Sequence, residues 1–166
     1  MKYTIGIVGC KNSGKTTLIK RLVNSLTSDN ISVATIKHAH HDFDIDQPGR
    51  DSHEHRLAGA NEVLISSQRR WAHINELGDN EKELKLSQLI EKIEDSQLII
   101  VEGFKKESHE KLEIHRRKNN KPLLYNKLSN VVAIVSDDIH KNVNVPVFAI
   151  DDITSIVNFI RKKFNL

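Results

Sequence analysis

The sequence predicts an α/β fold in which helices cover both faces of a mainly parallel β-sheet. Short apolar runs of strand length recur along the chain, and helical patterns alternate with several of them. The runs consist almost continuously of Val, Ile and Leu, as in parallel strands that are buried on both faces. A glycine-rich loop separates the first run from the first helical pattern. We therefore expect a single domain over residues 1–166, with its ligand beyond the C-terminal ends of the strands.

The first strand-like run, YTIGIV, is followed directly by GCKNSGKTT at residues 9–17. This stretch fits the phosphate-loop pattern G-x-x-x-x-G-K-[ST] without substitution. Glycine lets backbone N–H groups wrap closely around triphosphate oxygens, which bulkier side chains would obstruct. A chance turn is the alternative, but the motif has the strand-loop-helix frame that it requires. Apolar residues repeat at helical spacing after it, namely Leu18, Ile19, Leu22, Val23 and Leu26.

The loop predicts a P-loop NTPase domain that binds a nucleotide with Mg²⁺. The Lys15 ammonium can reach the outer phosphates and assist catalysis, and the Thr16 hydroxyl can complete the shell of the metal. The positive end of the following helix faces the bound anion. The residues expected to bind the nucleotide are Gly9, Asn12, Ser13, Gly14, Lys15, Thr16 and Thr17.

Five further apolar runs continue the predicted sheet, and two further helical patterns lie between and after them. The runs are ISVATIKH (31–38), EVLISS (62–67), QLIIVEG (97–103), NVVAIVSD (130–137) and VPVFAI (145–150). The helical faces consist of Leu86, Leu89, Ile90 and Ile93, and of Ile153, Ile156, Val157, Ile160 and Phe164. Asp151 or Asp152 is the expected N-cap of the last helix. We interpret all these apolar residues as core.

The segment KHAHHDFDIDQPGRDSHEHR, residues 37–56, begins where the second predicted strand ends. It holds five of the nine histidines, among them His40 and His41, together with four aspartates, Asp42, Asp44, Asp46 and Asp51. One interpretation is a magnesium site, in which Asp46 or its neighbour Asp44 approaches Thr16. A second is a transition-metal site built from imidazole. A third is a solvated loop before a helix that Asp51 caps, with Glu54 at position N3.

The second acidic signal is Glu102, which ends the apolar strand LIIV and precedes Gly103. In P-loop proteins an acidic residue at this place holds magnesium or its water, or orients the attacking group. The alternative is a glutamate that faces solvent at the end of a strand. Because the strand before it is wholly apolar, we assign Glu102 to the magnesium and catalytic site.

Composition excludes several other classes of protein. No apolar run approaches the roughly 20 residues needed to span a bilayer, and the N-terminus lacks the signature of a signal peptide, so we expect a cytoplasmic protein without membrane contact. Cys10 is the only cysteine and is best explained as a small loop residue. The net charge of +3 suits an anionic ligand, but with eight aromatic residues (five Phe, two Tyr and one Trp) it does not indicate nucleic acid.

Five stretches together resemble the molybdopterin-guanine dinucleotide biosynthesis protein B (MobB) family along nearly the whole chain. They are GCKNSGKTT, IKHAHHDFDIDQPGRDS, HEHRLAGANEVLISS with RRWA after it, VEGFK at 101–105, and VPVFAIDDI at 145–153. The resemblance implies a GTP-binding protein with weak GTPase activity. It implies that the protein assists the guanylyltransferase MobA in attaching GMP to molybdopterin, giving molybdopterin guanine dinucleotide. It also implies a homodimer.

Guanine recognition follows from the resemblance alone. The usual signature N-K-x-D is absent, because the only Asn-Lys pair, Asn126-Lys127, is followed by Leu128 and Ser129. Asp137 or Asp138, at the end of a predicted strand, could supply the carboxylate that meets the base edge. Three functions stay open at this point: a GTPase coupled to cofactor assembly, an adaptor that needs no turnover, and a metal-delivering GTPase that uses the histidines. A fourth function, a P-loop kinase of a small metabolite, is not supported, because the sequence shows no separate segment for a substrate pocket.

The basic segment 105–121 predicts a strand-like excursion from the sheet. Leu112 and Ile114 alternate with Glu113 and His115, as in a half-exposed strand. Seven basic residues surround them, which suits a solvated edge strand protected by lysines. The alternatives are a dimer-forming strand and a surface for an anionic pterin phosphate or a protein partner. Like charges would repel across a direct pairing of two such strands, which argues against the dimer seam.

Overall fold

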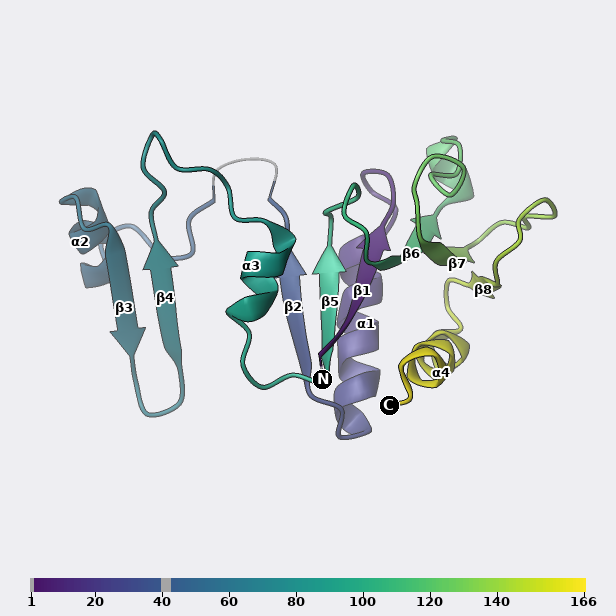
Figure 1. Cartoon of the computed structure of the whole chain (residues 1–166), viewed down its shortest axis with the longest axis horizontal. Coiled ribbons are helices and arrows are strands. Elements are labelled where there is room, and N and C mark those ends of the chain that lie inside the picture. Colours follow the sequence, from purple (N-terminus) through teal and green to yellow (C-terminus); the bar gives the residue numbers. More distant parts are fainter. Residues whose placement is uncertain (1, 40–42) are drawn as a thin grey trace. The chain divides into compact units, whose positions relative to one another are not determined.

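The computed structural model describes residues 2–39 and 43–166, so the predictions made for His40, His41 and Asp42 lie outside the described residues. The chain forms two compact units (Figure 1). The first contains residues 1–38 and 86–166, and the second contains residues 39–85. Among the described residues, no helix is long and apolar enough to cross a membrane.

The first unit is built on a six-stranded sheet with strand order β2-β5-β1-β6-β7-β8 (Figure 1). Every pairing in this sheet is parallel, which confirms the predicted α/β class. The strands are β1 (Tyr3–Val8), β2 (Val33–Lys37), β5 (Leu98–Glu102), β6 (Glu110–His115), β7 (Val131–Ser136) and β8 (Val147–Ala149). Because the strands are parallel, their C-terminal ends lie along one edge.

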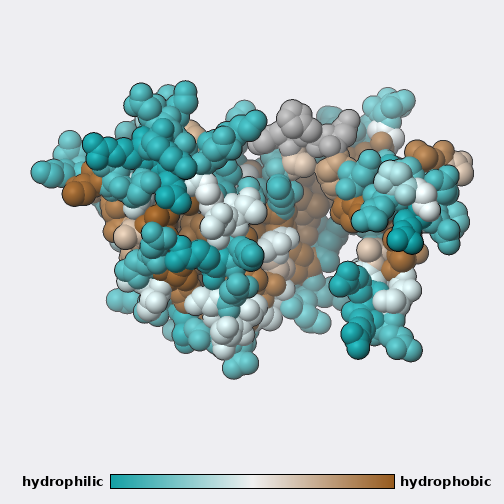
Figure 2. All heavy atoms as spheres, turned by 180° about the vertical axis from the view of Figure 1, so that it is seen from behind, coloured by the Kyte–Doolittle hydropathy of each residue, from teal (hydrophilic) through white to brown (hydrophobic). Residues whose placement is uncertain are grey.

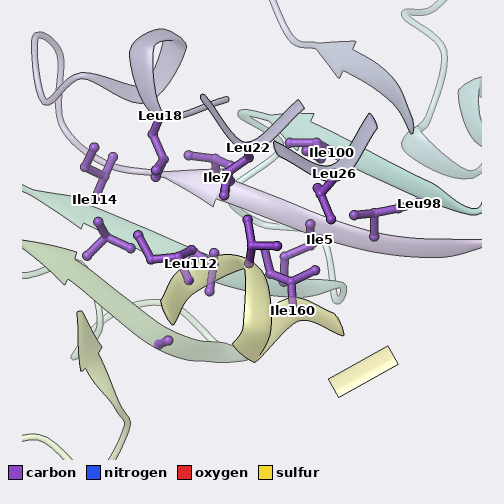
Figure 3. Packing of buried hydrophobic residues seen from close by; sticks show 14 of the residues in the cluster. Ile5, Ile7, Leu18, Leu22, Leu26, Leu98, Ile100, Leu112, Ile114 and Ile160 are labelled. Carbon is purple, nitrogen blue, oxygen red and sulfur yellow. The ribbon is translucent and has the colours of Figure 1, made fainter. Parts of the chain in front are cut away.

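Helices pack on both faces of this sheet, as predicted. Alternate residues of a strand point to opposite faces, so Ile100 lies in the cluster with α1 (Lys15–Ser28) and α4 (Ile153–Phe164). Its neighbours Ile99 and Val101 instead pack with Leu86 of α3 (Leu86–Glu91). Figure 3 shows the first cluster, in which Leu18, Leu22 and Leu26 of α1 pack over Ile5, Ile7, Leu98, Ile100, Leu112 and Ile114 of the sheet. Burying each of these leucines stabilises the fold by about 1.5–3 kcal/mol.

The last helix begins as the sequence indicates. The side chain of Asp152 accepts a hydrogen bond of 3.0 Å from the backbone N–H of Ser155 and is the N-cap of α4. Asp151 instead pairs with Arg21 of α1 at 2.9 Å. Of the two candidate caps, the structure therefore selects Asp152.

Strand β6 corrects the prediction of a half-exposed edge strand at 105–121. It pairs with β1 on one side and β7 on the other, and its polar residues Lys111 and Glu113 are buried. The Lys111 ammonium donates to the carbonyl oxygens of Glu107 (2.6 Å) and His109 (2.7 Å). The side chains of Lys111 and Glu113 are therefore covered by loops and do not face solvent.

Glu113 is satisfied by the loop that follows β6. Its carboxylate accepts the backbone N–H groups of Leu124 and Tyr125, each at 2.6 Å. Burial raises the pKa of the Glu113 carboxyl, and these two hydrogen bonds oppose that effect. Burial also disfavours the charged form of Lys111, which for an ammonium lowers the pKa.

His109 lies over the bare backbone of Gly6 in the neighbouring strand. A Cβ at Gly6 would lie 2.4 Å from the His109 Nε2, so a side chain there would collide with the ring. Both ring nitrogens are buried, without a hydrogen-bond partner among the described residues. Burial, helped by the charge of Lys111, lowers the pKa of His109 to about 4, so the ring is neutral at pH 7.

The second unit contains a two-stranded antiparallel hairpin and one short helix. The elements are α2 (Asp51–Leu57), β3 (Glu62–Ser66) and β4 (Trp71–Asn75). The expectation that residues 62–67 join the parallel sheet is wrong, because the tight loop at 67–70 returns the chain and β3 pairs with β4. Of β3 only Val63 is buried, whereas the inner strands β5 and β7 of the parallel sheet are buried almost throughout.

The predicted cap of α2 is also wrong. The N-cap is Arg50, without a side-chain capping bond, and Asp51 is the first helical residue. Asp51 and Glu54 lie in the first turn, where a negative charge interacts favourably with the helix dipole. The two carboxylates thus favour the helix start by charge and not by capping.

Candidate nucleotide-binding site

The phosphate loop connects β1 to α1 at the C-terminal edge of the parallel sheet. Gly9 lies so close to β6 that a Cβ would stand 2.4 Å from the backbone oxygen of Ile114. Gly14 has φ +93 and Asn12 has φ +63, both in the left-handed region that other L residues rarely adopt. The two glycines are therefore required, one by a close approach between backbones and the other by its conformation.

Lys15 begins α1 and folds back over its own loop. Its ammonium donates to the carbonyl oxygens of Cys10 at 3.0 Å and Gly9 at 3.4 Å. Burial lowers the pKa of Lys15, while the charge of Glu102 acts in the opposite direction. The same helix exposes Thr16 and presents a first turn, Lys-Thr-Thr-Leu, that carries no carboxylate to compete with a phosphate.

The remaining predicted nucleotide residues divide into exposed and buried ones. Thr17 and Asn12 are exposed, whereas Ser13 is buried inside the loop. The Ser13 hydroxyl and backbone N–H both donate to the Cys10 carbonyl, at 2.5 and 3.3 Å. The Ser13 side chain thus holds the loop closed, and its contribution to nucleotide binding stays a prediction.

Glu102 ends β5, the strand that pairs directly with β1. Its register partners are Ile7 of β1 and Lys37 of β2, so its carboxylate rises from the same edge as the phosphate loop. Gly103 follows with φ +99, and a Cβ there would meet the Cβ of His38 at 2.8 Å. The ring of His38 stacks on Phe104 at 4.6 Å. The structure therefore brings Glu102 and Lys15 to one edge, as expected for an acidic residue that follows a strand beside the phosphate loop.

Two further residues, Arg116 and Asn119, contact the phosphate loop and were not predicted from the sequence. The guanidinium of Arg116 donates through Nε to the Ser13 carbonyl at 3.4 Å. The Asn119 amide donates to the Lys11 carbonyl at 3.5 Å. Both follow β6, so placing this strand beside β1 would have identified them by the strand-end rule.

Asp137 follows β7 at the same edge, but its carboxylate already has donors. It accepts the backbone N–H of Arg117 at 2.8 Å and the Arg116 Nη1 at 3.3 Å. The Arg117 N–H and the Arg116 guanidinium, in that order, hold the pKa of Asp137 below its usual range. Its role in reading a guanine base stays a prediction.

Asp46 belongs to the second unit and is paired there with Arg56. Its two oxygens accept Nη2 at 2.9 Å and Nε at 3.2 Å, and its side chain is only 2% exposed. Asp44 and Glu76 lie at 2.8 and 3.4 Å from the same guanidinium. The hydrogen bond from Arg56 lowers the pKa of Asp46. A magnesium ligand at Asp46 stays a prediction.

The donor set at the edge of the first unit fits a magnesium triphosphate. The loop offers a cradle that a Cβ at Gly9 would disrupt, and the Lys15 ammonium supplies a positive charge. Thr16 and Glu102 carry oxygen atoms of the kind that Mg²⁺ prefers and would hold it there. When bound, Mg²⁺ would neutralise phosphate charge. Within residues 2–39 and 43–166, no group of three or more His, Cys, Asp or Glu side chains could hold a metal ion.

Comparison with known proteins gives one consistent family. The family model for molybdopterin guanine dinucleotide synthesis protein B matches residues 4–137. The chain is 39% identical over 151 residues to the molybdopterin-guanine dinucleotide biosynthesis adapter protein of Escherichia coli (strain K12), which covers 89% of this chain and 85% of that protein. It is 33% identical over 158 residues to the protein of the same name from Haemophilus influenzae, covering 94% of this chain and 86% of the other.

Solved structures show the same architecture. A crystal structure of molybdopterin-guanine biosynthesis protein B has a TM-score of 0.77 and 26% identity, over 96% of this chain and 99% of that one. A MobB homolog from Bacillus stearothermophilus has a TM-score of 0.72 over 98% of this chain and 97% of the other. At 19% identity, the latter supports the fold alone.

Proposed function

The chain belongs to the family of molybdopterin guanine dinucleotide synthesis protein B, and from this premise we propose that it is a GTP-binding adapter of molybdenum cofactor biosynthesis. In this proposal it binds GTP with Mg²⁺, hydrolyses it weakly, and assists a MobA-like guanylyltransferase in converting molybdopterin to molybdopterin guanine dinucleotide. It does so in the cytoplasm, as a homodimer.

The observation that carries the nucleotide part of the proposal is the phosphate loop beside Glu102. Glycines at positions 9 and 14 permit the loop geometry, Lys15 supplies the positive charge, and Glu102 comes from the neighbouring strand. The preference for guanine is inferred from the names of the relatives, which describe a guanine dinucleotide product.

Calorimetric titration tests this proposal directly. We expect Mg²⁺-GTP to bind at least about tenfold more tightly than Mg²⁺-ATP, since a base edge with matched hydrogen bonds is worth one to three kcal/mol. In a reconstituted reaction, adding the protein should increase the guanine dinucleotide formed by a guanylyltransferase from molybdopterin. Equal binding of both nucleotides, together with no effect on product, would contradict the proposal.

Replacing Glu102 with glutamine should separate binding from hydrolysis. The change removes one charge from the magnesium or water site and leaves the backbone cradle intact. We expect GTP affinity to fall no more than about threefold and turnover to fall about a hundredfold, as for loss of an orienting carboxylate. Steady-state hydrolysis measures the turnover. Glu94→Gln, an exposed residue before β5, is the matched control, and full activity in E102Q would show that Glu102 is only a strand end.

The homodimer is supported by exposed apolar side chains on the second unit. Leu64 and Trp71 are 68% and 67% exposed, and Phe43, Ile45 and Leu57 are exposed to a similar degree. Leu64 lies on the same face of the hairpin as Trp71, because Ser66, two residues on, pairs with Trp71. Figure 2 shows brown, apolar spheres among the polar surface of this unit. We infer that the face with Leu64 and Trp71 lies in the surface that the second copy covers.

A charge on the hairpin should dissociate the proposed dimer. Trp71 is the only tryptophan, so its fluorescence reports on this surface without labelling. We expect Leu64→Glu to weaken dimerisation about a hundredfold or more, because the interface would have to bury an unpaired charge. Light scattering and a red shift of the Trp71 emission measure the effect. Ile139→Glu, at an 82% exposed position of the first unit, should leave the mass unchanged. A monomeric wild-type protein would refute the dimer.

A second candidate function, delivery of nickel or zinc, makes opposite predictions for Asp46. If Asp46 helps to hold magnesium, Asp46→Asn should lower magnesium-dependent GTP affinity, and replacing His40 and His41 should have little effect. If the loop binds a borderline metal, zinc or nickel should bind tightly without nucleotide, and loss of the histidines should abolish that binding. Because Asp46 also pairs with Arg56, the thermal midpoint of D46N must be measured alongside.

The third possibility, an adaptor without turnover, predicts normal product formation with E102Q.

A further inference from the structure

The segment after β6, residues 116–119, donates hydrogen bonds to the phosphate loop. Arg116 donates to the Ser13 carbonyl at 3.4 Å, and Asn119 donates to the Lys11 carbonyl at 3.5 Å. The guanidinium also lies against Gly14, since a Cβ there would stand 3.6 Å from the Arg116 Nη2. Two alternate peptide units of the loop are therefore tied to the same neighbouring segment.

These contacts fix the direction of backbone donors in the loop. In a planar trans peptide the carbonyl and the following N–H point in opposite directions. Holding the Ser13 carbonyl against Arg116 therefore turns the Gly14 N–H away from Arg116. Holding the Lys11 carbonyl against Asn119 likewise turns the Asn12 N–H away from Asn119. A phosphate loop binds its ligand through such N–H groups, so their direction determines affinity.

Arg116 is itself fixed in place by Asp137. Its Nη1 donates to Oδ2 of Asp137 at 3.3 Å, while Oδ1 accepts the backbone N–H of Arg117 at 2.8 Å. The planar guanidinium can serve the Ser13 carbonyl and the carboxylate at once, which a lysine ammonium cannot do with the same geometry. The two side chains are 29% and 33% exposed, so solvent only partly weakens the pair.

We propose that Arg116, held by Asp137, is the residue that positions the phosphate loop for the triphosphate group. This inference rests on the proposed function only for the identity of the nucleotide, because the positioned N–H groups would bind phosphate and not the base. It also gives Asp137 a role different from reading guanine. Arg116 is thus a positioning residue, since it acts through the loop.

Inorganic tripolyphosphate with Mg²⁺ tests the proposal without any base. We expect Arg116→Ala to bind it about tenfold more weakly, the value of one hydrogen bond from a charged group. Lys118→Ala, which removes the same charge from an exposed residue two positions away, is the control and should change affinity less than about twofold. Arg116→Lys keeps the charge and should remain impaired. Full rescue by lysine would show that charge alone matters and would overturn the positioning role.

The sign of the effect at Asp137 separates positioning from simple electrostatics. Removing a carboxylate near an anion site should strengthen anion binding if only charge counts, whereas loss of the Arg116 anchor should weaken it. We expect Asp137→Ala to weaken tripolyphosphate, GTP and ATP by the same factor as R116A, and the double variant to be no weaker than either. Circular dichroism must show that each variant is folded.

Two results at Asp137 would overturn the inference. One is tighter binding of tripolyphosphate by D137A, and the other is a loss confined to GTP, which would assign Asp137 to the base. A wild-type protein without preference for GTP would instead contradict the proposed function and leave the tripolyphosphate result to decide this inference separately.

Discussion

Replacing Lys15 with alanine is expected to weaken binding of Mg²⁺-GTP about 10- to 100-fold, the range for loss of a hydrogen-bonding charged group. The ammonium now lies over the loop carbonyls of Gly9 and Cys10, so it is already positioned at the cradle and needs only to exchange these partners for phosphate oxygens. Because burial lowers the pKa of Lys15, a bound anion should also restore that pKa upward and favour the charged form.

Isothermal titration measures this loss, and Lys20→Ala, an exposed residue on the same helix, is the control. Thr16→Ala should behave differently, because its hydroxyl acts through the metal. We expect its effect to be large with Mg²⁺ present and small in EDTA, whereas the effect of K15A should persist in both. Unchanged affinity in K15A and T16A alike would remove the basis for a nucleotide site in this loop.

Replacing Gly9 with alanine should damage both the fold and the site. The new Cβ would stand 2.4 Å from the Ile114 carbonyl oxygen, and because that atom belongs to the backbone of β6, it cannot rotate away. We expect the free energy of unfolding to fall by about 1–3 kcal/mol, the usual cost of overpacking, or more if β6 must shift. Since β6 leads into Arg116, such a shift should also lower nucleotide affinity.

Urea denaturation followed by circular dichroism measures the stability of G9A. Gly78→Ala is a suitable control, because a Cβ there would meet only the Glu81 side chain at an ordinary 3.7 Å. The control should melt like the wild type. If G9A also matched the wild type in stability and in GTP binding, the close approach of the two backbones would not constrain the site.

Local patterns predicted most of the first unit. Continuous apolar runs identified the strands that are buried on both faces, and the helical repeat after GCKNSGKTT identified α1 with its three buried leucines. The phosphate-loop motif identified Lys15 and Thr16, and the acidic end of an apolar strand identified Glu102. These inferences depend on residues near in sequence, which is why the sequence alone could support them.

The errors concern hydrogen-bond and strand partners, which the spacing of apolar residues does not reveal. Lys111 and Glu113 alternate with apolar residues, as side chains facing solvent would, and this alternation does not show that carbonyl and N–H groups of nearby loops satisfy them. Residues 62–66 have strand character, but their antiparallel partner at 71–75 decided which sheet they join. Arg116 was grouped with a basic surface because its contact with Ser13 spans 103 positions of the chain.

The His109 imidazole, which packs on Gly6, makes the free energy of unfolding depend on pH. Its pKa is about 4 when folded and returns to about 6.5 when unfolding exposes the ring, so between these pH values the unfolded chain binds a proton that the folded chain excludes. Through this residue, stability is fully present above pH 6.5 and declines as the pH falls toward 4. Unfolding in weak acid thus takes up a proton. Because Gly6 has no side chain, the His109 ring can be buried there, and this burial makes the fold less stable in acid.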